Sequence, residues 1–249
     1  MLLRSRSLKR KTNRESEPAV LDKANFTIEY PKGHEYDAEQ MLEWASQVIS
    51  ILLPVFPDAL VMIGKTITIY LKEDTKCGFC SGGWTGNSPE MTFPLPSICA
   101  QKSASFDAEW YLGNIAHEFS HILYMKYRMT KANVGGYNYS DVPSWFGEGV
   151  GEYFRLLVMG EDKFEKKYSW YEPEVEKIIK YGLAGCSNVY AAGAWALRFF
   201  NDRYGSNTIT RIMKSSQKYF GDALQEETGV SPRGFKEEFQ KWLARVTNY

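Results

Sequence analysis

Histidine is rare in this chain, with three copies among 249 residues. An excess of charge of either sign is also lacking, because 30 lysines and arginines balance 30 aspartates and glutamates. A neutral balance creates no global field that would attract nucleic acid. No run approaches the roughly 18 apolar residues that a membrane-spanning helix needs. We therefore expect no nucleic-acid partner and no membrane span, and the length suits one domain with a substantial core.

The N-terminus lacks the apolar segment of a secretory signal. It is basic instead, with six positive residues before the first acidic one: Arg4, Arg6, Lys9, Arg10, Lys11 and Arg14. Such a stretch is compatible with a mitochondrial presequence or a nuclear address. We favour a flexible, solvated basic tail over residues 1–20. The expected location is intracellular and cytoplasmic, with an organellar address left open by this tail.

The chain has too few cysteines for disulfides to stabilise a protein of this length. There are four: Cys77, Cys80, Cys99 and Cys186. Cys77 and Cys80 have CxxC spacing, but no second CxxC follows and no helix opens there, so a zinc knuckle is not indicated. We expect free thiols in a loop, in keeping with a reducing compartment.

Hydrophobic periodicity divides the chain into two unlike halves. The first half predicts strands at 26–30, 66–71 and around 83–85 and 91–93, with one helix at 37–53 that Asp37 caps. From residue 107 onward helices follow one another, with Gly205 and Gly221 as stops, over 107–128, 143–159, 172–182, 188–204, 207–219 and 232–246. The order predicts an α+β fold, with a small mixed β-sheet in the N-terminal half and a mainly helical C-terminal half.

The helix predicted at 107–128 carries the pentapeptide HEFSH at 117–121. Its apolar residues form one face, and His117 and His121 lie nearly opposite that face, which argues against a role in the core. Two imidazoles at i and i+4 can bind one Zn²⁺, and Glu118 between them can accept a proton from water at the metal. The alternative is a pair of solvent-facing histidines on an exposed helix.

A catalytic zinc needs a third protein ligand and one open position. The remaining histidine, His34, lies far upstream, and Tyr124 and Tyr127 occupy the positions where metzincins carry glycine and histidine. We therefore expect a carboxylate from a downstream helix. Glu148 and Glu152 lie one turn apart on the same side of the helix predicted at 143–159. A solvated helix face is the alternative for both.

Three glycines, Gly147, Gly149 and Gly151, interrupt that same helix. Each should cost up to about 1 kcal/mol relative to alanine inside a helix. Their presence indicates close approach of the backbone to a neighbouring helix or to a substrate.

HEFSH followed by WFGEGVGEYF resembles the gluzincins, zinc metallopeptidases that pair HExxH with a downstream glutamate ligand. The match is best with the peptidase MA-like group, whose second motif reads roughly W-x-x-E-G-x-x-E/D-Y, and it covers about residues 60–205. The resemblance implies a zincin-like fold and one catalytic Zn²⁺ held by His117, His121 and Glu148. It also implies that Glu152 accepts the N–H of a ligating histidine and so fixes its orientation.

Tyr190 matches the tyrosine of a Tyr-x-x-Gly-Ala segment in gluzincin aminopeptidases, which implies that its hydroxyl stabilises the oxyanion. A packing role at the start of a helix is the alternative. The Gly-x-Met-Glu-Asn segment of those aminopeptidases is missing, since Glu90 and Met91 stand in reversed order. An endopeptidase is therefore favoured, with 86–93 as an open sheet edge to which an extended peptide can add.

The expected protein is thus a zinc-dependent metallopeptidase that acts on a peptide or protein substrate. Residues 21–249 would form one zincin-like catalytic domain, with an α/β sublobe at 21–130 and a helical sublobe at 131–249. Two alternatives stay open: a catalytically silent zincin-fold protein that binds a peptide or partner, and a zinc amidase with a non-protein substrate.

Overall fold

The computed structural model describes residues 18–73, 76–85, 87–131, 142–160, 162, 171–205 and 207–247. Most of the expected basic tail lies outside these residues, but its predicted end is too late because a strand already begins at Ala19. Two short 3₁₀ turns cover Glu172–Glu174 and Leu183–Gly185. The strands are β1 (Ala19–Lys23), β2 (Phe26–Tyr30), β3 (Ile67–Lys72), β4 (Ser81–Thr85) and β5 (Ser88–Pro94). The helices are α1 (Glu35–Leu52), α2 (Ala59–Ile63), α3 (Pro96–Lys102), α4 (Ala108–Lys131), α5 (Ser144–Met159), α7 (Val175–Tyr181), α8 (Val189–Tyr204), α9 (Thr208–Lys214), α10 (Phe220–Thr228) and α11 (Pro232–Val246).

The five strands form one mixed sheet in the order β1-β2-β3-β5-β4, as the sequence predicted in outline. β2, β3 and β5 are parallel, with Ile28 opposite Ile69 and Ile69 opposite Met91. All three of these side chains are buried. The outer strands β1 and β4 run antiparallel to their neighbours. A parallel centre needs helical crossovers, which α1 and α2 supply between β2 and β3.

The predicted open edge is wrong in its position. β5, which contains most of 86–93, lies between β3 and β4, so the edge on this side is β4. A tight hairpin joins β4 to β5, with Thr85 paired to Ser88. The glycines in β4 weaken its strand signal. The sequence therefore did not indicate that β4, rather than β5, is the edge strand.

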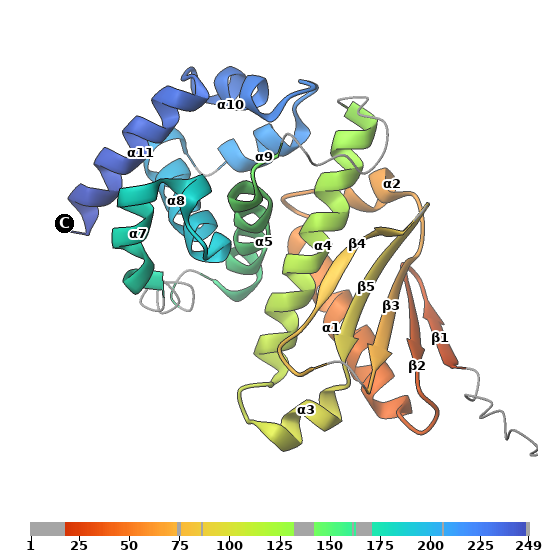
Figure 1. The fold of residues 1–249 in the computed structure, drawn as a ribbon. Coiled ribbons are helices and arrows are strands. Elements are labelled where there is room, and N and C mark those ends of the chain that lie inside the picture. The colour runs from red at the N-terminus through yellow and green to blue at the C-terminus, as the bar shows by residue number, and fades with distance from the viewer. Residues whose placement is uncertain are drawn as a thin grey trace, which may run out of the picture.

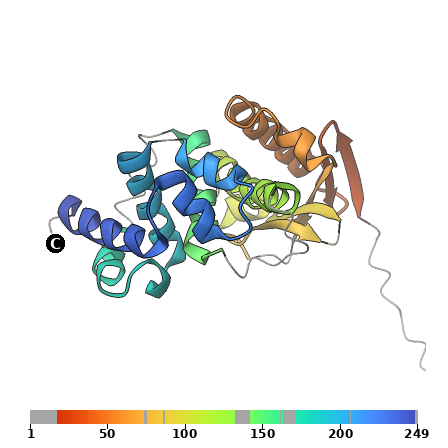
Figure 2. The same ribbon diagram turned by 90° about the horizontal axis from the view of Figure 1, so that it is seen from above.

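α4 stands between the sheet and the C-terminal helices (Figure 1). It contacts α1 and β4 on one side and α5 and α9 on the other. The view from above shows the same arrangement, with most of the C-terminal helices across α4 from the strands (Figure 2). The buried apolar side chains of both halves form one continuous cluster. The structure thus confirms the α+β class, and no helix of the described residues is long and apolar enough to cross a membrane.

Two of the predicted helix boundaries are wrong. Asp37 does not cap α1, which begins at Glu35; its buried carboxylate instead accepts hydrogen bonds from the Ser97 backbone N–H at 2.8 Å and hydroxyl at 2.6 Å. The helix predicted at 207–219 ends at Lys214, and Gly221 lies inside α10 rather than at a helix stop. A Cβ on Gly221 would lie 3.1 Å from Cγ of Pro232, so this glycine serves close packing.

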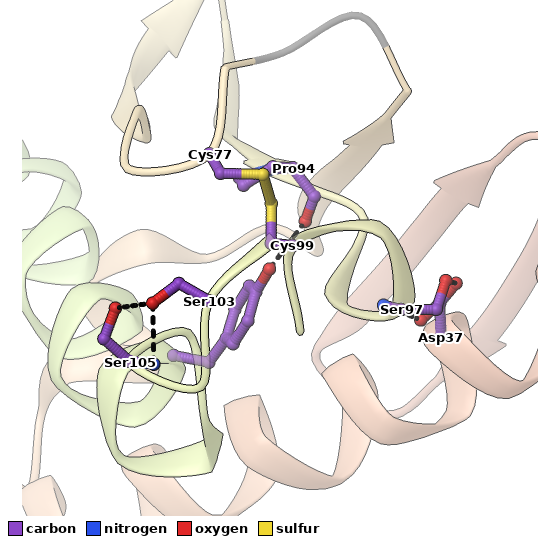
Figure 3. The surroundings of a disulfide bond; sticks show 8 residues. Asp37, Cys77, Pro94, Ser97, Cys99, Ser103 and Ser105 are labelled. Carbon is purple, nitrogen blue, oxygen red and sulfur yellow. Dashed lines mark hydrogen bonds between the residues drawn. A yellow bond between two sulfur atoms is a disulfide. The ribbon is translucent and has the colours of Figure 1, made fainter. Parts of the chain in front are cut away.

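A disulfide joins Cys77 to Cys99, with the two Cα atoms 5.5 Å apart (Figure 3). It connects the segment before β4 to α3, a helix that the periodicity did not reveal. The prediction of free thiols is therefore wrong for these two cysteines, whereas Cys80 and Cys186 are free. Disulfides are typical of oxidising compartments. Cysteine usage thus no longer supports a reducing location.

Candidate metal centre

Three predicted ligands meet at the contact between α4 and α5. Nε2 of His117 lies 3.0 Å from Oε2 of Glu148, and Nε2 of His121 lies 3.8 Å from the same oxygen. One ligand atom from each residue can be chosen so that all three lie within 4.8 Å of one another. The histidines come from successive turns of α4, and the carboxylate comes from the first half of α5.

These spacings fit a small metal ion. Tetrahedral zinc with bonds of about 2.0–2.2 Å requires its ligand atoms to be about 3.3 Å apart, and the two measured distances bracket that value. Two imidazole nitrogens and one carboxylate oxygen form a donor set that Zn²⁺ accepts. Nε2 of His117 hydrogen-bonds to Oε2 of Glu148, so these two ligand atoms already face each other. The three residues can therefore hold one metal ion.

His117 is more buried than its helical phase suggested. It is 3% exposed, and residues 115–120 are all buried because other elements cover α4 on every side. α5 covers the histidine at Gly151, where a Cβ would lie 2.3 Å from Cε1 of the imidazole. The prediction of close approach is thus confirmed for Gly151. It is also confirmed for Gly149, whose Cβ would lie 3.3 Å from the Gly193 backbone, but not for Gly147, which has open space.

The charges around the three ligands favour metal binding. Burial, together with repulsion from His117, lowers the pKa of His121 to about 4, so that its imidazole is neutral at physiological pH. Burial also lowers the pKa of His117, but the carboxylates of Glu148 and Glu152, which lie beside its two ring nitrogens, outweigh that effect and raise it. Burial raises the pKa of Glu148, but the two histidines outweigh it and lower the pKa overall. Glu148 is therefore an ionised, available ligand.

A cleft of about 460 Å³ opens beside the ligands, and Glu118 lines it. Gly82 of β4 borders one side, and Pro143 and Tyr190 border it as well. Glu118 is 5% exposed, and burial, with a further contribution from the charge of Glu148, raises the pKa of its carboxyl group. A carboxylate with a raised pKa, placed in a cleft beside metal ligands, is suited to proton transfer.

Tyr190 lies in the first turn of α8, and its ring centroid is 5.8 Å from that of His117. The side chain of Asn188 caps this helix by accepting the Ala191 N–H at 3.1 Å. Burial and the charges of Glu148 and Glu118 raise the pKa of Tyr190 to about 12. The phenol is therefore protonated at neutral pH and is available as a hydrogen-bond donor to the cleft.

Glu152 is fully buried behind His117, with Oε1 3.3 Å from Nδ1. The contact is close, but the direction is poor for a hydrogen bond, so Nδ1 lacks a well-aligned acceptor in this arrangement. Arg155 also reaches Glu152, at 2.5 Å, and extends to Asn114. Neither Arg155 nor Asn114 was predicted from the sequence. Helical spacing could have found them, because Asn114 lies three residues before His117 and Arg155 three residues after Glu152.

No family model matches this chain, and neither a curated protein nor a solved structure matches it. The described residues thus define a mixed α+β protein with a His/His/Glu group able to hold one metal ion.

Proposed function

We propose that this protein is a zinc-dependent metallopeptidase of the gluzincin type, with a zincin-like fold in one catalytic domain. The observation that carries the proposal is the meeting of His117, His121 and Glu148 at a cleft that Glu118 and Tyr190 also line. This combination places a metal-binding group, a candidate base and a neutral hydrogen-bond donor around one space.

Each residue has a defined task in peptide hydrolysis. His117, His121 and Glu148 would hold the Zn²⁺ ion, which when bound would supply Lewis acidity to lower the pKa of water towards about 7 and to polarise a carbonyl group. Glu118 accepts a proton from the attacking water as the new C–O bond forms, and it passes that proton to the leaving amine as the C–N bond breaks. The Tyr190 hydroxyl donates a hydrogen bond to the oxygen that gains negative charge. Glu152 faces Nδ1 of His117 and orients that ring.

The position of β4 supports an extended peptide as substrate. β4 is an edge strand, and a Cβ on Gly82 would lie 2.7 Å from Cβ and the carbonyl oxygen of Glu118. The strand therefore lies directly against the helix that carries the base. An edge strand has backbone groups that an added strand can pair with. A peptide paired there would run past Glu118, which suits cleavage within a chain.

Replacing Glu118 by Gln and His121 by Ala tests the proposal. We expect Glu118→Gln to retain zinc and to lose cleavage by at least about 100-fold, because general base catalysis contributes on this scale. His121→Ala should lose both zinc binding and cleavage. Elemental analysis measures the zinc, and mass spectrometry of a digested peptide library measures the cleavage.

The same experiment separates the alternatives. Stoichiometric zinc without cleavage of any peptide would favour a silent binding protein. Cleavage of small amides alone would favour a zinc amidase. Unimpaired turnover by Glu118→Gln would contradict the assignment of the base.

A further inference from the structure

Arg155 is a largely buried cation at the contact between α4 and α5, with its side chain 12% exposed. Its guanidinium group donates three hydrogen bonds: to the Gly113 carbonyl oxygen at 3.3 Å, to Oε1 of Glu152 at 2.5 Å and to Oδ1 of Asn114 at 2.6 Å. A Cβ on Gly113 would lie 3.3 Å from Cγ of Arg155. The glycine therefore leaves room for the arginine side chain. A planar fork of donors can fix several acceptors at once, which lysine cannot do.

One arm of this fork reaches the proposed ligand His117. Oε1 of Glu152 lies between Nη1 of Arg155 at 2.5 Å and Nδ1 of His117 at 3.3 Å. The Glu152 carboxylate is fully buried, so it needs a charged partner to remain ionised there. Arg155 supplies that partner. The guanidinium thus fixes the carboxylate that faces the ring nitrogen opposite the metal-facing Nε2.

The other arm reaches the cleft wall beside the proposed base Glu118. Oδ1 of Asn114 accepts from Arg155 and lies 3.4 Å from Sγ of Cys80. Nδ2 of the same amide donates to the Trp110 carbonyl oxygen at 2.7 Å, which sets its orientation. The Cys80 thiol donates its single proton to Oδ1 of Asn114, and Cys80 lines the cleft together with Glu118. Asn114 and Cys80 thereby connect Arg155 to the wall of the cleft beside the Glu118 carboxylate.

We propose that Arg155 is a positioning residue that holds His117 through Glu152 and supports the cleft wall beside Glu118 through Asn114 and Cys80. The proposal rests on the function proposed above. Its consequence is that one side chain, which does not line the cleft, controls metal affinity and turnover together. Loss of Arg155 should affect both, whereas loss of Asn114 should affect turnover alone.

Arg155→Met is the main variant, and Arg128→Met is its matched control. Arg128 is also a buried arginine of this helical region; it belongs to α4 and donates to the carbonyl oxygens of Gln217 and Lys218, away from the cleft. Both variants remove a buried guanidinium, so both should lose stability. Zinc affinity is measured by competition with a chelator, and turnover is measured at saturating zinc.

We expect Arg155→Met to weaken zinc binding by about 10–100-fold, as is typical when a partner behind a ligating histidine is lost. Its turnover at saturating zinc should also fall at least about 10-fold, while Arg128→Met changes neither quantity. Asn114→Ala should lower turnover with unchanged zinc affinity, and this second variant keeps the test open if Arg155→Met does not fold. Arg155→Lys should restore zinc affinity in part, because it keeps the charge without the fork.

Nitrogen NMR of the histidine rings in the metal-free protein gives a readout that is independent of activity. The chain has three histidines, and His34 lies elsewhere, bound to Asp37 at 2.9 Å, so it is an internal control. Arg155→Met should shift the ring signals of His117 and leave those of His34 unchanged. Equal behaviour of Arg155→Met and Arg128→Met in all three measurements would overturn the proposal. If the unaltered protein neither binds zinc nor cleaves peptides, the proposed function fails instead, and the His117 signals still report on Arg155.

Discussion

The missing side chain of Gly151 is what allows His117 to lie under α5. Gly151→Ala would place a methyl group 2.3 Å from Cε1 and 2.4 Å from Nδ1 of that imidazole. We expect a loss of about 1–3 kcal/mol in the free energy of unfolding, as is typical of overpacking, together with loss of zinc binding. Urea unfolding and a zinc assay measure the two effects.

Gly147→Ala is the matched control, because it is the same change in the same helix at a position with open space. It should raise the free energy of unfolding by up to about 1 kcal/mol, since alanine is the better helix former. Equal stability of the two variants would contradict the close contact at Gly151.

His121 should make the metal-free protein sensitive to acid. Its pKa is about 4 in the folded chain and 6.5 for an unperturbed histidine. Between these two pH values the unfolded chain binds a proton at His121 and the folded chain does not. Stability is therefore lost as the pH falls from about 6.5 to about 4, by about 3 kcal/mol at most. The raised pKa of His117 acts in the opposite direction, so the effect of His121 is read as the difference from a His121→Gln variant.

Chemical unfolding at a series of pH values in the presence of a chelator measures this difference. The His121→Gln protein should lose less stability over this range than the unaltered protein. Parallel curves for the two proteins would show that His121 is not held neutral by its surroundings.

At the scale of the elements, the close approach of α5 and α8 places Tyr190 at the cleft. A Cβ on Gly193 would lie 2.6 Å from the backbone nitrogen of Gly149 and 2.7 Å from the carbonyl oxygen of Trp145. Backbone atoms of a helix cannot move individually, so Gly193→Ala should push α8 away from α5. We expect a loss of about 1–3 kcal/mol in stability and reduced turnover, because Tyr190 lies one turn earlier on α8.

Zinc affinity should be nearly unchanged in Gly193→Ala, because the proposed ligands lie on α4 and α5. Gly149→Ala is a milder change at the same contact, since its nearest neighbours are 3.3 Å away. Turnover of Gly193→Ala equal to that of the unaltered protein would contradict the role of this contact in placing Tyr190.

The sequence predicted the elements whose signal is local and long. β2, α4, α5, α8 and α11 follow their predicted ranges closely, because alternation or helical periodicity persists through each of them. The sequence did not predict β1, α2, α3 and α10. These segments are short, and contacts with residues distant in sequence determine which of their apolar side chains are buried. The start of α1 was misplaced for a related reason: Asp37 binds Ser97, 60 residues away, and no local rule reveals that.

The candidate site was predictable for the same physical reason. The ligand spacing of His117 and His121 is a property of one helix, and Glu148 and Glu152 share one face of another. Glu118 followed from its place between the two histidines, and Tyr190 followed from motif resemblance. Arg155, Asn114 and Cys80 were not found, because their contacts join separate elements. The Cys77–Cys99 disulfide likewise depends on α3, which brings together two residues 22 positions apart.

For the whole molecule, the site lies where the two halves meet. The central helix α4 carries two proposed ligands and packs on the sheet side against α1 and β4, while α5 supplies the third and packs on α8. A metal ion bound by both helices would therefore tie the halves together. Anything that binds the folded chain alone stabilises it, by about 2.7 kcal/mol when free zinc is 100 times its dissociation constant.

The central claim is that one zinc ion binds to His117, His121 and Glu148, and a calorimetric zinc titration tests it most directly. The unaltered chain should bind one zinc ion, whereas Glu148→Gln should bind at least about 100-fold more weakly because it loses a charged ligand. Glu174→Gln is the control, since Glu174 pairs with Lys177 at 3.0 Å and is not among the proposed ligands. One zinc bound by the unaltered chain and by Glu174→Gln, with affinity lost in Glu148→Gln, is the predicted result. No binding, or equal binding by all three proteins, would contradict the account.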